Sequence, residues 1–241
     1  MNKTLPFIFS FSVFALSMDV QAQEPNSLWV TANAGICSSL IINQNAYGNG
    51  ELDYATTIGY AAGLGVDYFI SDKWGVNSSV SLAKLGQHYR GTQSGGEAIR
   101  KVNLDYIELP LLVMRRIVKA KKTTWIAFGP EFMFLISAKQ EYHRTGGSPL
   151  PEPDYLTEGT TDIKERFKPV DLAFNFSLFR MFDLNYRNRN LLLLMSANMA
   201  LGLTDINSND WHTPNMHGDY AGSHNFYIGI RAGLMYKAFV K

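Results

Sequence analysis

The chain has 241 residues and a formal net charge of +1, with 22 lysines and arginines against 21 aspartates and glutamates. This balance argues against a nucleic-acid binder, which needs a strongly basic surface, so no nucleic-acid partner is predicted. Cys37 is the only cysteine, which excludes an intramolecular disulfide and a multi-cysteine metal cage, and we expect it to be a small buried side chain. A mean hydropathy of −0.09 argues against a bundle of membrane helices, but membrane β-strands show apolar residues only at alternate positions.

The first 22 residues have the pattern of a secretory signal peptide. A basic start at Lys3 precedes an apolar segment, Leu5 to Leu16, and a small-residue site at Val20-Gln21-Ala22. The apolar segment is too short to cross a bilayer comfortably, and no second apolar helix follows it. We therefore expect cleavage after Ala22, which would leave residues 23–241 as one domain.

Beyond residue 22, apolar residues recur with period two, which indicates β-strands. The clearest run is 57–69, where Ile58, Tyr60, Leu64 and Val66 share one face and glycines and Asp67 share the other. The same alternation returns in 170–179 and 225–236. These runs reach the roughly 9 to 11 residues that a tilted strand needs to cross a bilayer, against a usual strand of about 5 to 6.

Eight such runs predict an all-β, eight-stranded antiparallel up-and-down transmembrane β-barrel. The expected strands are 28–38, 57–69, 74–89, 101–114, 124–139, 167–179, 190–203 and 224–239. The connections between them alternate between long and short, as in barrels with short periplasmic turns and longer outer loops. An even strand number places both termini on one side, which we expect to be the periplasm.

Aromatic residues cluster at the strand ends expected to face the periplasm. Interfacial aromatic girdles of this kind flank the apolar band of membrane barrels. The residues predicted to form the girdle are Tyr68, Phe69, Trp74, Trp125, Phe179, Phe182, Tyr236 and Phe239.

Several segments, in this order along the chain, resemble the PorT-like outer-membrane β-barrel family, found chiefly in Bacteroidota. The segments are VDYFISDKWGVNSSVSLAKLGQHY (66–89), DYIELPLLV (105–113), AFGPEFMFLISAK (127–139), VDLAFNF (170–176) and ALGLTDI (200–206). The chain departs from the family at Asn198-Met199, where Arg-Tyr is frequent, and at its end, Phe239-Val240-Lys241. The resemblance implies an eight-stranded outer-membrane barrel and no particular activity.

The last outer loop holds the residues most suited to catalysis or metal binding. Asp210 and His212, with His217 and Asp219 behind them, could form a surface hydrolase resembling the omptin proteases, or could gather a metal ion. Solvated loop residues are the preferred reading of this loosely spaced set. No catalytic, cofactor-binding or metal-ligating residue is therefore assigned, and no cofactor is expected.

Strand alternation points Glu131, Asp171 and Arg231 into the barrel, where an eight-stranded lumen is filled by side chains. Glu108, Lys84 and Lys139 are less certain members, because Pro110 and a break in the alternation near Lys84 blur their register. We expect a buried charge network in a lumen closed to solutes, with Arg231 bonded to Glu131 or Asp171. An ion path is the alternative reading.

A basic turn follows the fourth expected strand and carries Arg115, Arg116, Lys119, Lys121 and Lys122. It is either a solvated periplasmic turn or a docking surface for an acidic partner. The longest outer loop, 140–166, suits a mobile binding segment. The function favoured by the sequence is a non-enzymatic barrel with a surface-binding, structural or secretion-associated role; the alternatives are the Asp210/His212 hydrolase and a narrow solute channel. Expected partners are outer-membrane lipid, the barrel-assembly machinery and a periplasmic or surface protein.

Overall fold

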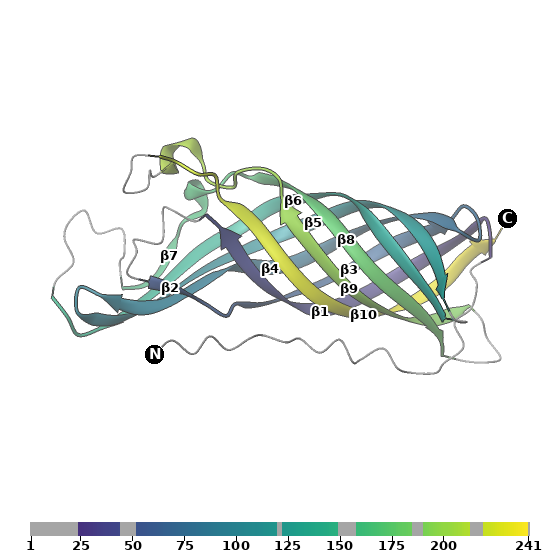
Figure 1. The fold of residues 1–241 in the computed structure, drawn as a ribbon, viewed down its shortest axis with the longest axis horizontal. Helices are drawn as coiled ribbons and strands as arrows, with labels where there is room; N and C mark the ends of the chain where they lie inside the picture. Colours follow the sequence, from purple (N-terminus) through teal and green to yellow (C-terminus); the bar gives the residue numbers. More distant parts are fainter. Residues whose placement is uncertain are drawn as a thin grey trace.

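The computed structural model describes residues 24–43, 52–119, 122–148, 158–184, 190–212 and 219–240. Eight long strands form a closed antiparallel ring, and two short strands attach to it (Figure 1). The ring consists of β1 (Ser27–Ile42), β3 (Ile58–Phe69), β4 (Trp74–Gln93), β5 (Gly96–Lys119), β6 (Lys122–Thr145), β8 (Val170–Asp183), β9 (Leu191–Gly202) and β10 (His224–Val240). The short elements are β2 (Leu52–Ala55), β7 (Gly159–Asp162) and the 3-10 turns η2 (Lys164–Arg166) and η3 (Asn209–Trp211).

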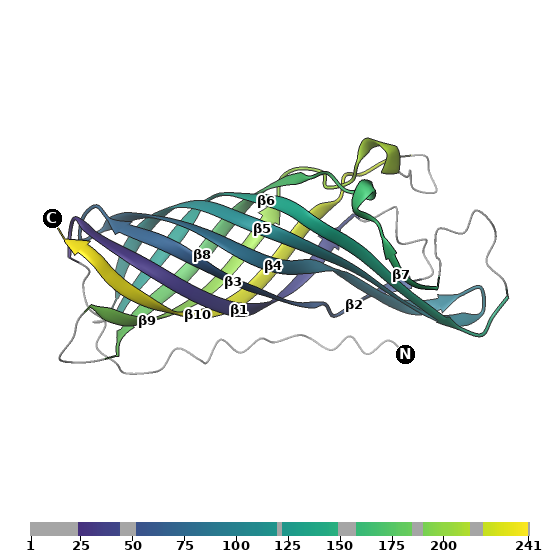
Figure 2. The same ribbon diagram turned by 180° about the vertical axis from the view of Figure 1, so that it is seen from behind.

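Each ring strand pairs with its neighbour along the chain, and β1 pairs with β10 to close the ring. The order of neighbours is therefore up-and-down, and the eight predicted strands all occur. Ser27 pairs with Val240, so the described chain starts and ends at one rim of the barrel, which we call the terminal rim. The opposite rim carries η2 and η3 and is called the loop rim (Figures 1 and 2). No helix within the described ranges is long and apolar enough to span a membrane.

The predicted two-faced pattern of the strands is confirmed in β3. Leu64 is 66% exposed and Ile58 63% exposed on the outside, whereas Ala61, Asp67 and Phe69 are buried inside. A ring of large apolar side chains continues around the outer surface of the other strands, as a membrane barrel requires. Examples are Ile36, Leu82, Val113, Phe128, Phe174, Met199, Ile230 and Leu234.

Strands β4, β5 and β6 extend well past the rest of the loop rim (Figures 1 and 2). Both β5 and β6 have 24 residues, about twice the roughly 9 to 11 that a bilayer requires. We call the extension the ribbon and define it as residues 85–105 of β4 and β5 with residues 138–145 of β6. The short strands line its edges, because β2 pairs with β4 and β7 pairs with β6.

The expected strands 74–89 and 101–114 leave residues 90–100 as an outer loop, and this prediction is wrong. The chain remains a strand to Gln93 and reverses at Ser94-Gly95, whose positive φ angles of 48° and 77° fit a type I′ hairpin turn. Alternating apolar residues mark a strand only where one face meets lipid or a core. The ribbon has polar side chains on its outer face, so the alternation of apolar and polar residues ends before the strand ends. For the same reason, part of the expected loop 140–166 is strand: β6 continues to Thr145 and β7 forms at 159–162.

We predict that Leu64→Arg lowers the unfolding free energy of the barrel in lipid vesicles by about 2 to 4 kcal/mol, as for a cation near the bilayer midplane. Thr92→Arg is the matched control, because Thr92 is exposed on the ribbon, beyond the apolar belt. Denaturant titrations of both variants measure the difference. Equal stability of the two variants would contradict the lipid-facing position of Leu64.

Candidate functional site

An aromatic plug closes the lumen near the terminal rim. The Trp125 side chain is fully buried, with its ring centroid 4.9 Å from that of Phe69 and 6.3 Å from that of Phe179. The apolar cluster also contains Trp29, Leu112, Met114, Ala127, Met181, Leu192 and Met235. This cluster fills the lumen at this end with apolar side chains.

The predicted aromatic girdle is confirmed for four residues and wrong for the other four. Tyr68, Trp74, Tyr236 and Phe239 are exposed on the outer surface, as an interfacial girdle requires. Phe69, Trp125, Phe179 and Phe182 are buried instead. The clearest reason is strand parity, because Tyr68 and Phe69 are adjacent in one strand and must point to opposite faces.

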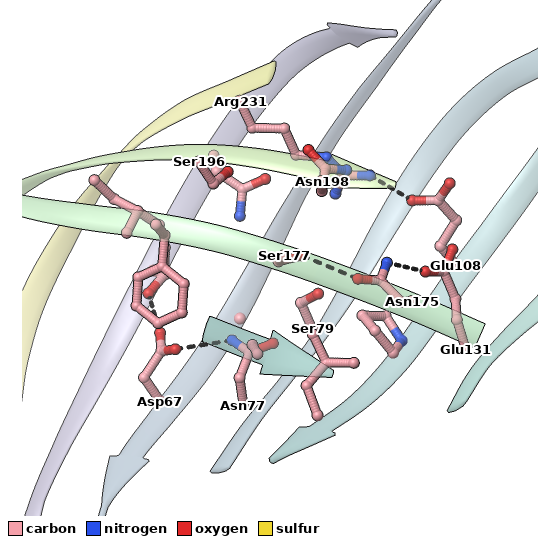
Figure 3. A pocket seen from close by; sticks show the side chains of 18 residues that line it. Asp67, Asn77, Ser79, Glu108, Glu131, Asn175, Ser177, Ser196, Asn198 and Arg231 are labelled. Atoms are coloured by element: carbon pink, nitrogen blue, oxygen red, sulfur yellow. Dashed lines mark hydrogen bonds and ion pairs between the residues drawn. The ribbon is translucent and has the colours of Figure 1, made fainter. Parts of the chain in front are cut away.

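A polar cavity of about 80 Å³ lies on the inner side of the plug (Figure 3). Its walls come from strands on all sides of the ring and are rich in amide, hydroxyl and carboxylate groups. The polar lining residues are Thr31, Asn33, Asp67, Asn77, Ser79, Glu108, Glu131, Asn175, Ser177, Ser196, Asn198 and Arg231. A second apolar cluster, which includes Tyr89, Leu104, Tyr106 and Phe167, fills the barrel toward the loop rim.

Arg231 reaches across the lumen to Glu108. Its Nη2 donates to Glu108 Oε2 at 2.8 Å, and its Nη1 donates to Ser81 Oγ at 3.3 Å. The predicted partners, Glu131 and Asp171, were therefore wrong, although all three residues lie in the barrel interior. Glu108 is only 1% exposed, and the sequence obscured its inward position because Pro110 interrupts the pattern two residues later.

Glu131 and Asp171, the two partners predicted for Arg231, have neutral partners instead. Glu131 accepts hydrogen bonds from Tyr227 Oη, at 2.9 and 3.0 Å, and from the Asn175 amide. Asp171 accepts from Asn225 Nδ2 at 2.9 Å and from Thr204 Oγ1 at 2.6 Å. These donors satisfy the oxygen atoms of the Glu131 and Asp171 side chains.

Lys84 and Lys139 do not join the interior network. Lys84 pairs across the sheet with Tyr60, which is 60% exposed, so both side chains are on the outer face. Lys139 is exposed as well. Their expected inward position is wrong because these lysines lie where β4 and β6 leave the apolar belt, and a polar residue there no longer marks the lumen.

A second polar cluster lies at the loop rim, in the connection between β9 and β10, and is centred on Asp205. Its carboxylate accepts hydrogen bonds from Tyr220 Oη at 2.8 Å and from the backbone N–H of Ser223 at 2.9 Å. His212 Nε2 lies 3.1 Å from Asp205 and the His212 ring stacks on Tyr220. Partial burial raises the pKa of Asp205, but these hydrogen bonds and the charge of Lys168 outweigh it and hold that pKa below its ordinary value. Burial and the adjacent carboxylate raise the pKa of Tyr220 to about 12.

This cluster differs from the hydrolase or metal site considered from the sequence. His212 pairs with Asp205 and not with Asp210, which is exposed, and Asp219 is exposed too. His217 lies outside the described residues. Within the described part of the chain, no three His, Cys, Asp or Glu side chains come together as metal ligands. Sequence reasoning missed Asp205 because it precedes the histidine by seven residues, and only the loop fold brings them together.

The predicted basic turn lies at the terminal rim. The Arg115 guanidinium lies over the Trp74 ring, 5.0 Å from its centroid, and Arg116 donates to the Asp72 carbonyl at 3.3 Å. Lys119 and Lys122 end and begin the two strands, with side chains outside the described set, and Lys121 lies outside it entirely. The two described cations of this turn therefore pack against the barrel rim.

We predict that Trp125→Ala lowers the unfolding free energy by about 3 to 5 kcal/mol, because it empties the centre of the plug. Trp74→Ala, which removes a side chain that is 41% exposed, should lower it clearly less. Denaturant unfolding of both variants in the same vesicles compares them. A larger loss for Trp74→Ala would place Trp125 outside the lumen.

Arg231→Met should lower the unfolding free energy by about 3 to 5 kcal/mol, because it leaves the buried Glu108 carboxylate without its cation. Adding Glu108→Gln should restore part of this loss. Adding Asp171→Asn is the control and should restore none, because Asp171 has other partners. Rescue by Asp171→Asn and not by Glu108→Gln would refute the Arg231–Glu108 pairing.

Comparisons with known proteins identify the family of this chain. A search of curated proteins finds no match. Solved structures with a similar fold include OprG from Pseudomonas aeruginosa (11% identity, 91% of this chain and 99% of that chain covered, TM-score 0.47), Neisserial surface protein A (10%, 87% and 96%, 0.42) and Ail from Yersinia pestis (12%, 89% and 100%, 0.37). The family model described as outer membrane protein beta-barrel domain matches residues 21–208, well over half of the chain. The chain therefore belongs to the outer membrane protein β-barrel domain family.

Proposed function

We propose that this outer-membrane barrel is a non-enzymatic module that binds a macromolecular partner at the cell surface through its ribbon. The observation that carries the proposal is the length of β5 and β6, which continue as paired strands far beyond what a membrane requires. A bilayer gives no reason for this extension, whereas a binding surface raised above the membrane does.

The outer face of the ribbon is suited to water and to polar contacts. Lys101 Nζ lies 3.2 Å from Glu141 Oε2, and Asn103 Nδ2 donates to Glu141 Oε1 at 3.1 Å. A polar groove near the tip is lined by Arg90, Thr92, Glu97, Ile99, His143 and Thr145. Charged side chains on adjacent strands would be costly in lipid, so this face belongs outside the membrane.

The inner face of the ribbon is packed, which favours a rigid platform. Tyr89, Arg100, Gln140 and Tyr142 are all buried there, and Tyr142 Oη donates to Gln93 Oε1 at 3.0 Å. Side chains on rigid strands hold their positions better than those on free loops, which lowers the ordering cost of binding.

The proposed orientation places the ribbon outside the cell and both termini in the periplasm. The terminal rim has the short β3–β4 and β5–β6 connections, and short periplasmic turns with larger outer structures are typical of this class. The PorT-like likeness of the sequence is compatible with a secretion-associated role, in which the basic turn would meet a periplasmic partner.

The two alternatives have weaker support. A narrow channel needs a water path, and the aromatic plug opposes one. A hydrolase on this loop was expected to use Asp210 with His212, but His212 pairs with Asp205 and stacks on Tyr220.

The orientation is tested by an epitope tag inserted between Ser94 and Gly95, at the ribbon tip, and detected by antibody on intact cells. We expect labelling without permeabilisation. The control tag, between Asp72 and Lys73 in the β3–β4 turn, should be labelled only after permeabilisation. The reverse pattern would overturn the proposed orientation.

Binding is tested with a photo-crosslinking amino acid at Thr92 in intact cells, and with the same residue at Val66 in the lipid-facing belt as control. We expect a discrete protein adduct from Thr92 and lipid adducts from Val66. Once the partner is identified, adding it in soluble form should reduce the Thr92 adduct. Lack of any protein adduct at Thr92 and at other outer-face ribbon positions, such as Ile99 and His143, would refute the binding role.

A further inference from the structure

We propose that the polar cavity inside the barrel binds one monovalent inorganic cation, held by Glu108 and Asn198. The site lies between the aromatic plug and the Arg231–Glu108 pair, with the labelled side chains converging on it from several strands (Figure 3).

The first argument is that buried acceptor atoms at the cavity have no donor. Glu108 Oε1, Asn198 Oδ1 and Asn33 Oδ1 make no hydrogen bond, although each is shielded from solvent. Glu108 is 1% exposed and Asn198 7% exposed, and both line the cavity. A buried acceptor without a partner costs about 1 to 3 kcal/mol, and more for a charged group, so a bound species is expected to satisfy these atoms.

The second argument is the balance of charge. Glu108 and Glu131 both line the cavity, and Arg231 supplies the one cation among its described lining residues. Asp67, at the other side of the cavity, already accepts from Thr31 Oγ1 at 2.6 Å and from Asn77 Nδ2 at 2.9 Å. Three acidic side chains therefore line the cavity against one guanidinium, which favours a bound cation over a bound anion.

The third argument concerns the kind of cation. Carboxylate and amide oxygens suit hard cations. No group of three His, Cys, Asp or Glu residues suited to a metal ion occurs in the described ranges, which disfavours a divalent or transition-metal cage. A cavity of about 80 Å³ is large enough for a sodium or potassium ion with water.

The experiment measures thermal unfolding of the detergent-solubilised barrel in sodium, potassium or N-methyl-D-glucamine chloride at equal ionic strength. A ligand that binds only the folded state raises stability by mass action. We expect a saturable rise of the unfolding midpoint in sodium or potassium over the bulky organic cation. Identical midpoints in the three salts would show that water or protons satisfy the cavity, and would overturn the proposal.

Substitutions test whether the cation-specific rise of the unfolding midpoint arises at the cavity. Asn198→Leu removes an acceptor that has no described partner, so the barrel should fold while the cation-specific rise is lost. Asn209→Leu, at an exposed loop position, is the matched control and should keep the rise. Sodium-23 NMR relaxation gives a second readout: protein-dependent broadening should disappear in Asn198→Leu and in Glu108→Gln. A rise that persists unchanged in Asn198→Leu would place the cation elsewhere and refute the site.

Discussion

Strand β1 pairs with β10 along its length, from Ser27 with Val240 to Ile42 with His224, and the rest of the structure depends on this pairing. A membrane offers no water to hydrogen-bond a free strand edge, so a transmembrane sheet must close. Closure with eight strands then fixes a lumen that side chains fill. It also brings Arg231 of β10 within reach of Glu108 on β5, 123 residues earlier in the chain.

The interior is organised in layers along the barrel. An aromatic and methionine-rich plug lies near the terminal rim, and a polar layer with Asp67, Glu108, Glu131 and Arg231 lies in the middle. A second apolar cluster lies toward the loop rim. The apolar layers at both ends keep bulk water away from the buried charged groups. Hydrogen bonds within the protein therefore provide much of the stabilisation of these groups. The resulting rigid barrel supports the ribbon, where we place recognition.

Much of this fold could be predicted from the sequence, because lipid on one side and a packed lumen on the other produce strict alternation. The faces of β3, from Ile58 to Phe69, follow directly from it. The prediction was wrong where a strand lacks the apolar outer face that produces this alternation. The outer face of the ribbon is polar, so 90–100 looked like a loop, and Lys139 looked like a lumen residue. Cross-lumen partners such as Arg231 and Glu108 depend on ring geometry, which no local pattern contains. The Asp205 cluster likewise forms only when the loop between β9 and β10 folds back.

A closed, side-chain-filled lumen is the central claim of this account, and conductance of the purified protein in planar lipid bilayers tests it most directly. The packing of Trp125 between Phe69 and Phe179 predicts no steady current above the bare bilayer at any applied voltage that the membrane tolerates. A reproducible, steady single-channel conductance from the wild-type barrel would contradict the closed lumen, and would favour the solute-channel alternative over a surface-binding barrel.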